Sequence, residues 1–483
     1  PAMINFTAGS ANILSACKAA EVTTILTSRS FVAQARLAPV VEELARSLKI
    51  AWLEDIRDTI GPLDKLFGLL RRSKPLVARK PDDPAVVLFT SGSEGAPKGV
   101  VLTHRNILSN LDGIEQIIEF THGDVLMGVL PFFHSFGYTG TMWFPLTSGF
   151  GVVFHPNPTD AKTIGELAQQ HRATILISTP TFCGAYARKV PSEHFATLRY
   201  AIVGAEKLRE PVARAFKERF GVTLLEGYGC TELAPVVSAN MPETDEHGVP
   251  RLGSKSGSVG HPLPGIAAKV IDPDTGDGPI FGTPGLLLIK GPNRMQGYLG
   301  DPVRTAEAIR DGWYVTGDVA IVDEDGFIFI TDRLARFSKI AGEMVPHGRI
   351  EDVIATFLGD AAAVSVTSVP DDVKGERLVA CLGRRSAKSG HDNSRGQPSS
   401  SQRTLQETAM PHQLHPVGSA ILVIMRQGPR FVGWKLAHFR RGFTLWAVGY
   451  GFYGLAVPGF GCAVVERKAA SSNGSQWPRR PAA

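Results

Sequence analysis

Short apolar runs alternate with helically spaced apolar residues along the first half of the chain, and this pattern predicts an α/β fold. The runs are typical of buried strands and cover residues 23–27, 50–52, 86–89, 124–130, 173–178, 198–203 and 222–225. Helical spacing of apolar residues predicts helices at residues 8–20, 31–48 and 209–220. Strands that alternate with helices favour a parallel sheet, and we expect one sheet to include both residues 86–89 and residues 124–130.

The pattern changes after residue 240. Short β-rich runs then alternate with Gly, Pro and Asp, at residues 269–271, 285–290, 320–322 and 327–330. This pattern of short runs separated by turn residues is typical of a small β subdomain. The predicted fold class is therefore α/β, with a large N-terminal region of doubly wound parallel sheets and a small β subdomain.

Length, cysteine usage and charge narrow the class of protein. A chain of 483 residues is too long for one hydrophobic core and predicts roughly two to four domains. The five cysteines are scattered without paired spacing, which argues against a disulfide framework or a zinc site and fits a reducing compartment. Residues 381–483 hold fourteen Lys/Arg against three Asp/Glu, whereas the remainder holds thirty-seven against forty-three. An acidic body thus precedes a basic tail, which has no recognised nucleic-acid-binding motif, so we expect no nucleic-acid partner.

The apolar run at 86–89 leads into a loop of hydroxyl residues and glycines, Thr-Ser-Gly-Ser-Glu-Gly-Ala-Pro-Lys, at residues 90–98. Glycines let the backbone wrap closely around an anion, and Lys98 adds a positive charge suited to phosphate. The loop is not the common P-loop, because Pro97-Lys98-Gly99 replaces the final Gly-Lys-Ser/Thr. A flexible surface loop is the alternative, since most Ser/Gly-rich stretches are of that kind.

The ordered string TSGSEGAPKGV is more specific than a glycine-rich loop. It resembles the phosphate-binding loop of the adenylate-forming (AMP-binding) enzymes, a superfamily of acyl-CoA synthetases, acyl-[acyl-carrier-protein] synthetases, luciferases and peptide-synthetase adenylation domains. The resemblance implies that the loop holds the pyrophosphate part of ATP and that Lys98 assists catalysis. The implied phosphate-binding residues are Thr90, Ser91, Gly92, Ser93, Gly95 and Lys98.

Two further loops follow predicted strands, where ligands of open α/β sheets bind. Small residues in Gly204-Ala205-Glu206 and at Gly227 would let a flat base approach the backbone, and Tyr228 offers a stacking face. After Gly229, Thr231 would donate to the α-phosphate, and Glu232 supplies a hard oxygen for Mg²⁺. The alternative is a turn with a helix cap, because Thr and Glu both favour helix starts.

His134 lies in Pro131-Phe132-Phe133-His134-Ser135-Phe136-Gly137. A lone histidine beside aromatic residues is more often a packed core residue than a functional one. The string resembles the family motif at the mouth of the acyl pocket, where an aromatic–histidine pair gates entry of the carboxylate. The resemblance therefore implies a catalytic gating role for His134.

Asp318 ends the string Thr316-Gly317-Asp318, which by itself is usually only a turn. The family places such an aspartate on the ribose hydroxyls, from which a carboxylate accepts two hydrogen bonds. Arg333 follows fifteen residues later and matches the family arginine that contacts ribose and phosphate. We therefore expect both residues to bind the nucleotide.

Residues 333–351, which include Phe-Ser-Lys-Ile-Ala-Gly-Glu-Met-Val-Pro-His at 337–347, resemble the hinge and start of the family's small C-terminal domain. The sequence of residues 337–347 is most similar to the acyl-[acyl-carrier-protein] synthetase and 2-acylglycerophosphoethanolamine acyltransferase branch. In this phospholipid-related group the ligase module is often fused behind an acyltransferase. Arg336 lies near the usual pivot. The opening residues 3–9 read like the middle of a domain, so we expect an incomplete N-terminus.

Four regions are therefore predicted. Residues 1–240 form the α/β core, residues 241–332 the β-rich subdomain that completes it, and residues 333–380 the hinge with a remnant of the small α+β C-terminal domain. Residues 381–483 form an atypical tail, disordered or frame-shifted, because the resemblance stops near residue 380. A charge-free run at residues 442–465 is long enough to span a bilayer, although six glycines and Pro458 weaken it as a helix.

The resemblance implies a two-step ligase. ATP with Mg²⁺ activates a fatty acid as an acyl-adenylate, and a phosphopantetheine thiol of acyl carrier protein takes the acyl group. The alternatives are a fatty acyl-CoA ligase and a non-catalytic nucleotide-binding remnant, because the tail lacks the family's final Gly-Lys pair, whose lysine assists adenylation. We expect a cytoplasmic protein, either free or peripheral to the inner membrane through a fused acyltransferase or transporter module or through the tail.

Overall fold

The structure is a computed structural model that describes residues 1–72, 74–75, 77–90, 97–242, 244–246, 249–251, 253–340, 343–358, 363–371, 375–383, 420–425, 452–456 and 463–467. The chain divides into two units, Pro1–Ile330 and Thr331–Ala483. The division falls inside one strand, β20 (Ile328–Arg333). Each unit is described by itself.

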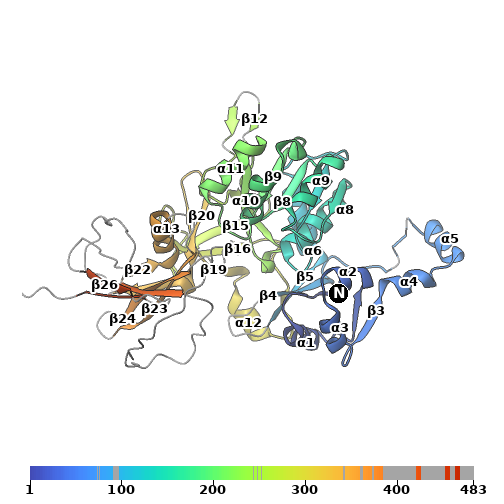
Figure 1. The fold of residues 1–483 in the computed structure, drawn as a ribbon, viewed down its shortest axis with the longest axis horizontal. Coiled ribbons are helices and arrows are strands. Elements are labelled where there is room, and N and C mark those ends of the chain that lie inside the picture. Colours follow the sequence, from blue (N-terminus) through green and yellow to red (C-terminus); the bar gives the residue numbers. More distant parts are fainter. Residues whose placement is uncertain are drawn as a thin grey trace, which may run out of the picture. The chain divides into compact units, whose positions relative to one another are not determined.

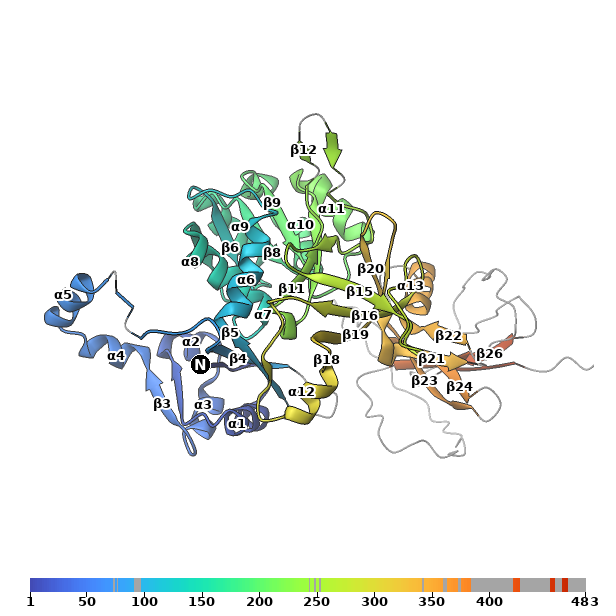
Figure 2. The same ribbon diagram turned by 180° about the vertical axis from the view of Figure 1, so that it is seen from behind.

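The centre of the first unit is a seven-stranded sheet with helices packed on it (Figures 1 and 2). Four strand pairs are parallel and join five strands, and two antiparallel strands extend one edge. In spatial order the strands are β7 (Gly151–Phe154), β6 (Val125–Gly128), β8 (Ile175–Ser178), β9 (Tyr200–Val203), β10 (Leu224–Gly229), β11 (Val236–Ala239) and β14 (His261–Pro262).

The parallel strands are buried, which explains why they were visible as continuous apolar runs. All four residues of β8 are buried, and Leu126 and Met127 of β6 are completely inaccessible. The chain crosses between strands through α9 (Ala161–Gln170), α10 (Pro180–Lys189) and α11 (Glu210–Phe220). Two of these helices begin with a side-chain cap: Asp160 accepts from Thr163 N in α9, and Thr179 accepts from Phe182 N in α10. The predicted doubly wound α/β core is confirmed.

One detail of the predicted sheet is wrong. The strand β4 (Pro84–Thr90) does not lie in the sheet that contains β6; it forms an antiparallel hairpin with β5 (Lys98–Thr103). A parallel pair requires a crossover of a dozen or more residues, and only residues 91–97 separate these two strands. The second apolar run therefore folds back on the first, and β1 (Ala2–Met3) and β17 (Gly297–Tyr298) complete this smaller sheet.

The N-terminal helices and strands lie close to their predicted positions, except that one predicted helix is divided into two. Helix α1 (Ser10–Ala19), β2 (Thr24–Thr27) and β3 (Lys49–Trp52) match the predicted elements, and β2 and β3 form a separate parallel pair. The helix predicted at 31–48 is instead α2 (Arg29–Gln34) and α3 (Ala38–Leu44). The break occurs because Arg36 adopts a positive φ of 55° and a proline occupies the first turn of α3.

The β-rich region after residue 240 forms an antiparallel sheet. Its strands are β15 (Ala267–Ile271), β16 (Gly285–Lys290), β19 (Trp313–Val322), β18 (Ile309–Arg310) and β20. The same stretch of chain also forms the hairpin of β12 (Thr244–Glu246) with β13 (Val249–Arg251) and the short helix α12 (Pro302–Ala308). Buried residues of β16 and β19 join the same hydrophobic cluster as the seven-stranded sheet, so this sheet completes the first unit.

In its described residues, the second unit contains an antiparallel sheet and an α-helix. The sheet contains β22 (Glu343–Pro346), β21 (Phe337–Ile340), β24 (Gly375–Gly383), β23 (Ala363–Asp371) and β25 (Ala420–Met425), and the helix is α13 (His347–Leu358). Arg336 Nη2 donates to Glu351 Oε1 at 2.5 Å, which joins the predicted pivot residue to α13.

Part of the tail is described as strands. The strands are β25, β26 (Phe452–Ala456) and β27 (Ala463–Arg467), of which the last two pair with each other. They include part of the charge-free run at 442–465, and the rest of that run lies outside the described residues. Among the residues that the structure describes, no helix combines the length and apolar character needed to cross a membrane.

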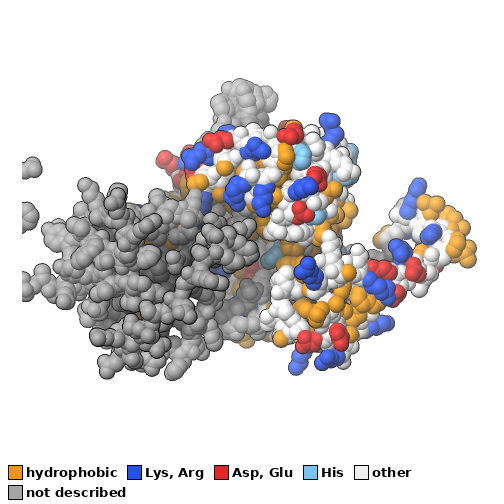
Figure 3. All heavy atoms as spheres, in the orientation of Figure 1, with side chains coloured by type: hydrophobic (Ala, Val, Ile, Leu, Met, Phe, Trp, Pro, Cys, Tyr) orange, Lys and Arg blue, Asp and Glu red, His pale blue; other side chains and the backbone are white. Residues whose placement is uncertain are grey.

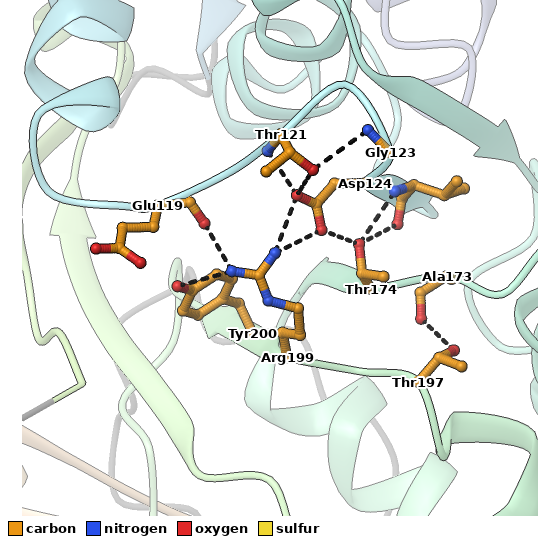
Figure 4. A network of polar contacts seen from close by, with 10 residues as sticks. Glu119, Thr121, Gly123, Asp124, Ala173, Thr174, Thr197, Arg199 and Tyr200 are labelled. Carbon is orange, nitrogen blue, oxygen red and sulfur yellow. Dashed lines mark hydrogen bonds and ion pairs between the residues drawn. The ribbon is translucent and has the colours of Figure 1, made fainter.

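A buried carboxylate joins the starts of three parallel strands (Figure 4). Asp124, only 2% exposed, accepts hydrogen bonds from Thr121 N at 2.7 Å, Thr174 Oγ1 at 2.6 Å and Arg199 Nη1 at 2.9 Å. Burial alone would raise the pKa of this carboxyl, but the hydrogen bonds and the Arg199 charge outweigh it, and the pKa is lowered. The network therefore ties the segment before β6 to the segments before β8 and β9.

Replacing Asp124 with alanine is expected to lower the free energy of unfolding by about 2–3 kcal/mol, because donors on three residues, Thr121, Thr174 and Arg199, lose their acceptor. The Arg199 side chain is 42% exposed, so water screens its part of the loss. Since the folded pKa of Asp124 is lowered, this stability is present above the unfolded pKa and is lost as the pH falls through the folded pKa. Urea unfolding at several pH values measures both effects, and Thr174→Val, which removes one donor, should cost less.

Candidate functional site

The candidate site lies at the carboxyl ends of β9 and β10 in the first unit. A Cβ on Gly204 would lie 3.2 Å from Gly227 O and 3.5 Å from Phe136 Cε1. The backbone that follows β9 therefore packs directly against β10 and against the segment after β6. The segments that contain Phe136, Gly204 and Gly227, which are predicted to bind the carboxylate or ATP, thus meet at one edge of the sheet, as expected for ligand sites of open α/β folds.

The motif at 227–229 belongs to a strand rather than to the predicted loop. Strand β10 continues to Gly229 because β11 returns beside it in an antiparallel pair, with an irregular register between Tyr228 and Gly229. A Cβ on Gly229 would lie 2.0 Å from Pro235 O, so this position requires glycine. The chain then enters a short 3₁₀ helix at Thr231–Leu233, which directs Thr231 and Glu232 past the end of the strand.

Tyr228 and Asp318 contact each other although ninety positions separate them. The Tyr228 hydroxyl donates to Asp318 Oδ2, and Asp318 is buried on β19. Asp318 N in turn donates to Thr316 Oγ1 at 3.0 Å, and that hydroxyl donates to Leu287 O at 2.8 Å. Burial and the Asp318 charge raise the pKa of Tyr228, so its hydroxyl remains a neutral donor. The Thr-Gly-Asp string is therefore more than an isolated turn.

Thr231 and the aromatic–histidine string also come together. Thr231 Oγ1 lies 3.3 Å from Ser135 Oγ, the residue after His134. His134 is an exposed residue, but partial desolvation of its imidazole by surrounding atoms lowers its pKa. Its ring lies 4.7 Å from that of Phe133, which in turn contacts Phe6 at 5.3 Å between ring centroids. The imidazole therefore packs against the Phe133 ring, and the next residue, Ser135, carries the contact with Thr231.

Glu232 has a partner that the sequence did not reveal. The Tyr298 hydroxyl donates to Glu232 Oε1 at 2.9 Å, and Lys98 Nζ lies 5.8 Å from the centre of the same ring. Strand β17 brings Tyr298 opposite Val100, immediately after the predicted phosphate loop. Sixty-six positions separate Glu232 from Tyr298, and no local spacing indicated the contact.

The remaining predicted residues divide into four groups. Thr90 and Lys98 face each other across the β4–β5 hairpin, at the two ends of the predicted phosphate loop. Ser91, Gly92, Ser93 and Gly95 lie outside the described residues. Ala205 adopts a positive φ of 67°, and Glu206 accepts from Thr181 Oγ1 at 2.5 Å. Arg333 belongs to the second unit.

A buried acid lies one residue before the Gly-Tyr-Gly motif. Glu226 is 7% exposed, and burial raises the pKa of its carboxyl to about 7, although the Leu208 N–H donates to it at 2.8 Å. Its backbone oxygen accepts from Asn240 N at 2.9 Å and from Asn240 Nδ2 at 3.0 Å. Glu226 thus connects the strand that carries the site to the loop after β9.

Replacing Glu226 with glutamine, which mimics the protonated acid, is expected to stabilise the protein at about pH 8 by up to roughly 3 kcal/mol. The folded pKa is raised from 4.5 to about 7, so the folded state binds the proton more tightly and wild-type stability falls as the pH rises through this range. Urea unfolding of both proteins at several pH values measures the difference. An unchanged pH profile in the variant would contradict the assignment.

Metal binding at this site would depend on few protein ligands. Among the described residues, no group of three or more His, Cys, Asp and Glu side chains lies close enough to hold a metal ion. Mg²⁺ that binds with nucleotide phosphates needs only one or two carboxylates, because phosphate oxygens and water complete its shell. The single half-buried carboxylate of Glu232 fits that requirement.

The fold and the converging loops define an α/β protein of the adenylate-forming class. The match to the AMP-binding enzyme family covers residues 1–299, more than half of the chain, and the chain belongs to this family. It is 35% identical over 322 residues to 4-coumarate–CoA ligase 2 of Oryza sativa subsp. japonica, covering 65% of this chain and 55% of that protein. It is 31% identical over 302 residues to the long-chain-fatty-acid–CoA ligase of Bacillus subtilis, covering 62% and 52%.

Among solved structures, the chain is similar to ATP-bound MatB from Rhodopseudomonas palustris. The TM-score is 0.63 and the identity 28%, with 80% of this chain and 74% of that chain covered. This similarity confirms the predicted fold class. The match to the two ligases spans about half of their length.

Proposed function

We propose that the chain is an AMP-forming acid–thiol ligase that activates a fatty carboxylate with ATP and transfers it to a phosphopantetheine thiol. The carboxylate oxygen bonds to the α-phosphorus of ATP while the bond to pyrophosphate breaks. The thiol sulfur then bonds to the acyl carbon and AMP leaves. The family membership and the names of its relatives support this reaction class.

The observation that carries the proposal is the convergence of segments that are distant in the sequence. Gly204 packs on Gly227, Tyr228 bonds to Asp318, Thr231 approaches Ser135, and Glu232 bonds to Tyr298 beside Lys98. Small backbone surfaces, an aromatic face, a buried carboxylate and a cation are the groups that a nucleotide requires. An assembly of unrelated turns would not produce this complementarity.

Each group has a role in the proposed first step. Gly204, Ala205, Glu206, Gly227, Tyr228 and Gly229 form the base site, Asp318 and Arg333 bind the ribose, and residues 90–98 hold the phosphates. Thr231 donates to the α-phosphate, and Glu232 would hold Mg²⁺, which supplies charge neutralisation when bound. Since carboxylate and triphosphate repel each other, catalysis consists mainly of positioning and charge stabilisation.

His134 is proposed to gate the carboxylate rather than to carry a fixed charge. Desolvation lowers the pKa of its imidazole, so near neutral pH it remains an uncharged ring that packs beside Phe133. A neutral gate neither traps the carboxylate in an ion pair nor excludes its apolar chain.

The acceptor thiol distinguishes two versions of the function. The relatives above are named as CoA ligases, which favours CoA. The resemblance of the sequence at residues 337–347 to acyl-[acyl-carrier-protein] synthetases favours acyl carrier protein. Incubating the chain with ATP, Mg²⁺, a long-chain fatty acid and either acceptor, and measuring the thioester formed, separates the two.

The proposed function is tested by isothermal titration with ATP together with fatty acid-dependent pyrophosphate release. We expect ATP to bind and pyrophosphate to be released slowly. Residues 381–483 lack the Gly-Lys pair whose lysine assists adenylation in the family, and its absence should lower the release rate by roughly a hundredfold. Binding without fatty acid-dependent release would favour the non-catalytic remnant. Absence of ATP binding would overturn the assignment of the site.

A further inference from the structure

A helical arm extends from the N-terminal part of the first unit. It contains α4 (Leu53–Thr59) and α5 (Pro62–Leu70), and we define it as residues 53–80, of which 73 and 76 lie outside the described residues. Figures 1 and 2 both show α5 at the outer end of the unit. No residue of α4 or α5 is buried by the described part of the chain.

The exposed side of α5 is strongly apolar. Leu63, Leu66, Phe67 and Leu70 follow the spacing i, i+3, i+4 and i+7, which places them on one face of the helix. They are 69%, 51%, 60% and 68% exposed, and Leu69 beside them is 58% exposed. Figure 3 shows orange side chains gathered on the outer end of this arm. A soluble surface rarely leaves such a face uncovered, so it indicates an interaction site.

Basic residues adjoin this apolar face. Between positions 61 and 80 the chain has six Lys/Arg and one acidic residue, and that residue, Asp64, accepts from Gly61 N at 2.9 Å at the start of α5. Lys65 falls on the side of the helix opposite Phe67, Arg71 and Arg72 directly follow its last residue, and further basic residues lie at 74, 79 and 80. All six basic side chains are exposed.

The base of the arm is fixed to the unit. Arg29 donates from Nη1 and Nη2 to the two carboxylate oxygens of Asp55, at 2.7 and 2.9 Å, and its backbone N–H donates to Glu54 Oε1 at 2.9 Å. The Arg29 guanidinium also lies 4.9 Å from the centre of the Trp52 ring. These contacts hold the start of α4 against α2, while α5 remains available.

We propose that the arm docks on an anionic lipid bilayer, with α5 parallel to the surface. An apolar face that enters the acyl boundary and Lys/Arg residues that meet lipid phosphates are the two components of an interfacial helix. A second copy of the chain is a poorer occupant, because a symmetric contact would bring the basic clusters of both copies together. Docking does not require the proposed ligase activity, but it would place that activity where fatty acids concentrate.

The test is flotation of the full chain, without ATP, with phosphatidylcholine vesicles and with vesicles that contain about 30 mol% phosphatidylglycerol. We expect binding to the anionic vesicles only. The double variant Leu66→Asp/Phe67→Asp should lose at least about tenfold in binding, because two apolar anchors become charges. Arg71→Glu/Arg72→Glu should lose the anionic binding in the same way, and added salt should weaken the wild type.

Matched controls are Leu146→Asp and Phe281→Asp, which change equally exposed apolar residues elsewhere, 71% and 67% exposed, and should bind like the wild type. Thermal unfolding should be unchanged in the arm variants, since their side chains make no buried contacts. Absence of wild-type binding, or full binding by Leu66→Asp/Phe67→Asp, would overturn the proposal. The proposal would also be overturned if light scattering showed that the wild type is a dimer and that Leu66→Asp/Phe67→Asp is a monomer, while neither protein bound vesicles.

Discussion

Replacing Glu232 with glutamine is expected to lower the rate of fatty acid-dependent ATP–pyrophosphate exchange by about 10²–10³-fold. Glutamine keeps an oxygen that accepts the Tyr298 hydrogen bond of 2.9 Å, so the local structure should survive. The substitution removes the negative charge that would hold Mg²⁺, and a neutral amide is a much weaker ligand for a hard cation. The loss should therefore appear mainly in the rate and in a raised Mg²⁺ requirement.

Tyr298→Phe provides the matched control. It removes the hydroxyl donor but leaves the Glu232 carboxylate charged, and we expect a loss of about tenfold or less. Thermal unfolding of both variants shows whether the fold is retained. If Glu232→Gln exchanged pyrophosphate at the wild-type rate at low Mg²⁺ concentration, Glu232 would not be the metal ligand.

Replacing Asp318 with asparagine is expected to weaken AMP binding by about ten- to a hundredfold, measured by isothermal titration. A carboxylate accepts from both ribose hydroxyls, whereas the amide presents one oxygen. Asp318 is 5% exposed, so a hydrogen bond lost there is not replaced by bulk water.

Tyr228→Phe separates binding from structure at the same place. It removes the donor to Asp318 but retains the ring face offered to the base, and the expected loss of affinity is smaller. 2′-Deoxy-AMP provides a second control, because it lacks one of the two hydroxyls. If Asp318→Asn weakened AMP and 2′-deoxy-AMP equally, the contact with the 2′-hydroxyl would be excluded.

The sequence predicted much of the fold because buried parallel strands must be continuously apolar. Strands β8 and β9 lie where their apolar runs were found, β10 begins inside its run but continues to Gly229, and α11 follows its helical spacing. The sequence-based prediction failed where the connection between strands decides which strands pair. Strand β4 has the composition of a parallel strand, but the short connection to β5 makes an antiparallel hairpin.

The motifs also revealed residue types without revealing their contacts. Gly229 was recognisable as a site residue, but only the return of β11 shows that Pro235 O leaves no room for a side chain. Tyr298 was not found at all, because a lone tyrosine far from the other motifs has no distinctive spacing. Its contact with Glu232 arises from pairing of β17 with β5.

The alternation of strands and helices, the motifs and the class of protein that they indicate follow from the local order of residues along the chain. The packing of Gly204 on Gly227, the contacts of Tyr228 with Asp318 and of Glu232 with Tyr298, and the uncovered apolar face of α5 in the described chain follow from the three-dimensional arrangement. Contacts between residues sixty or more positions apart depend on how sheets pair and pack, and nothing in their immediate neighbours encodes that.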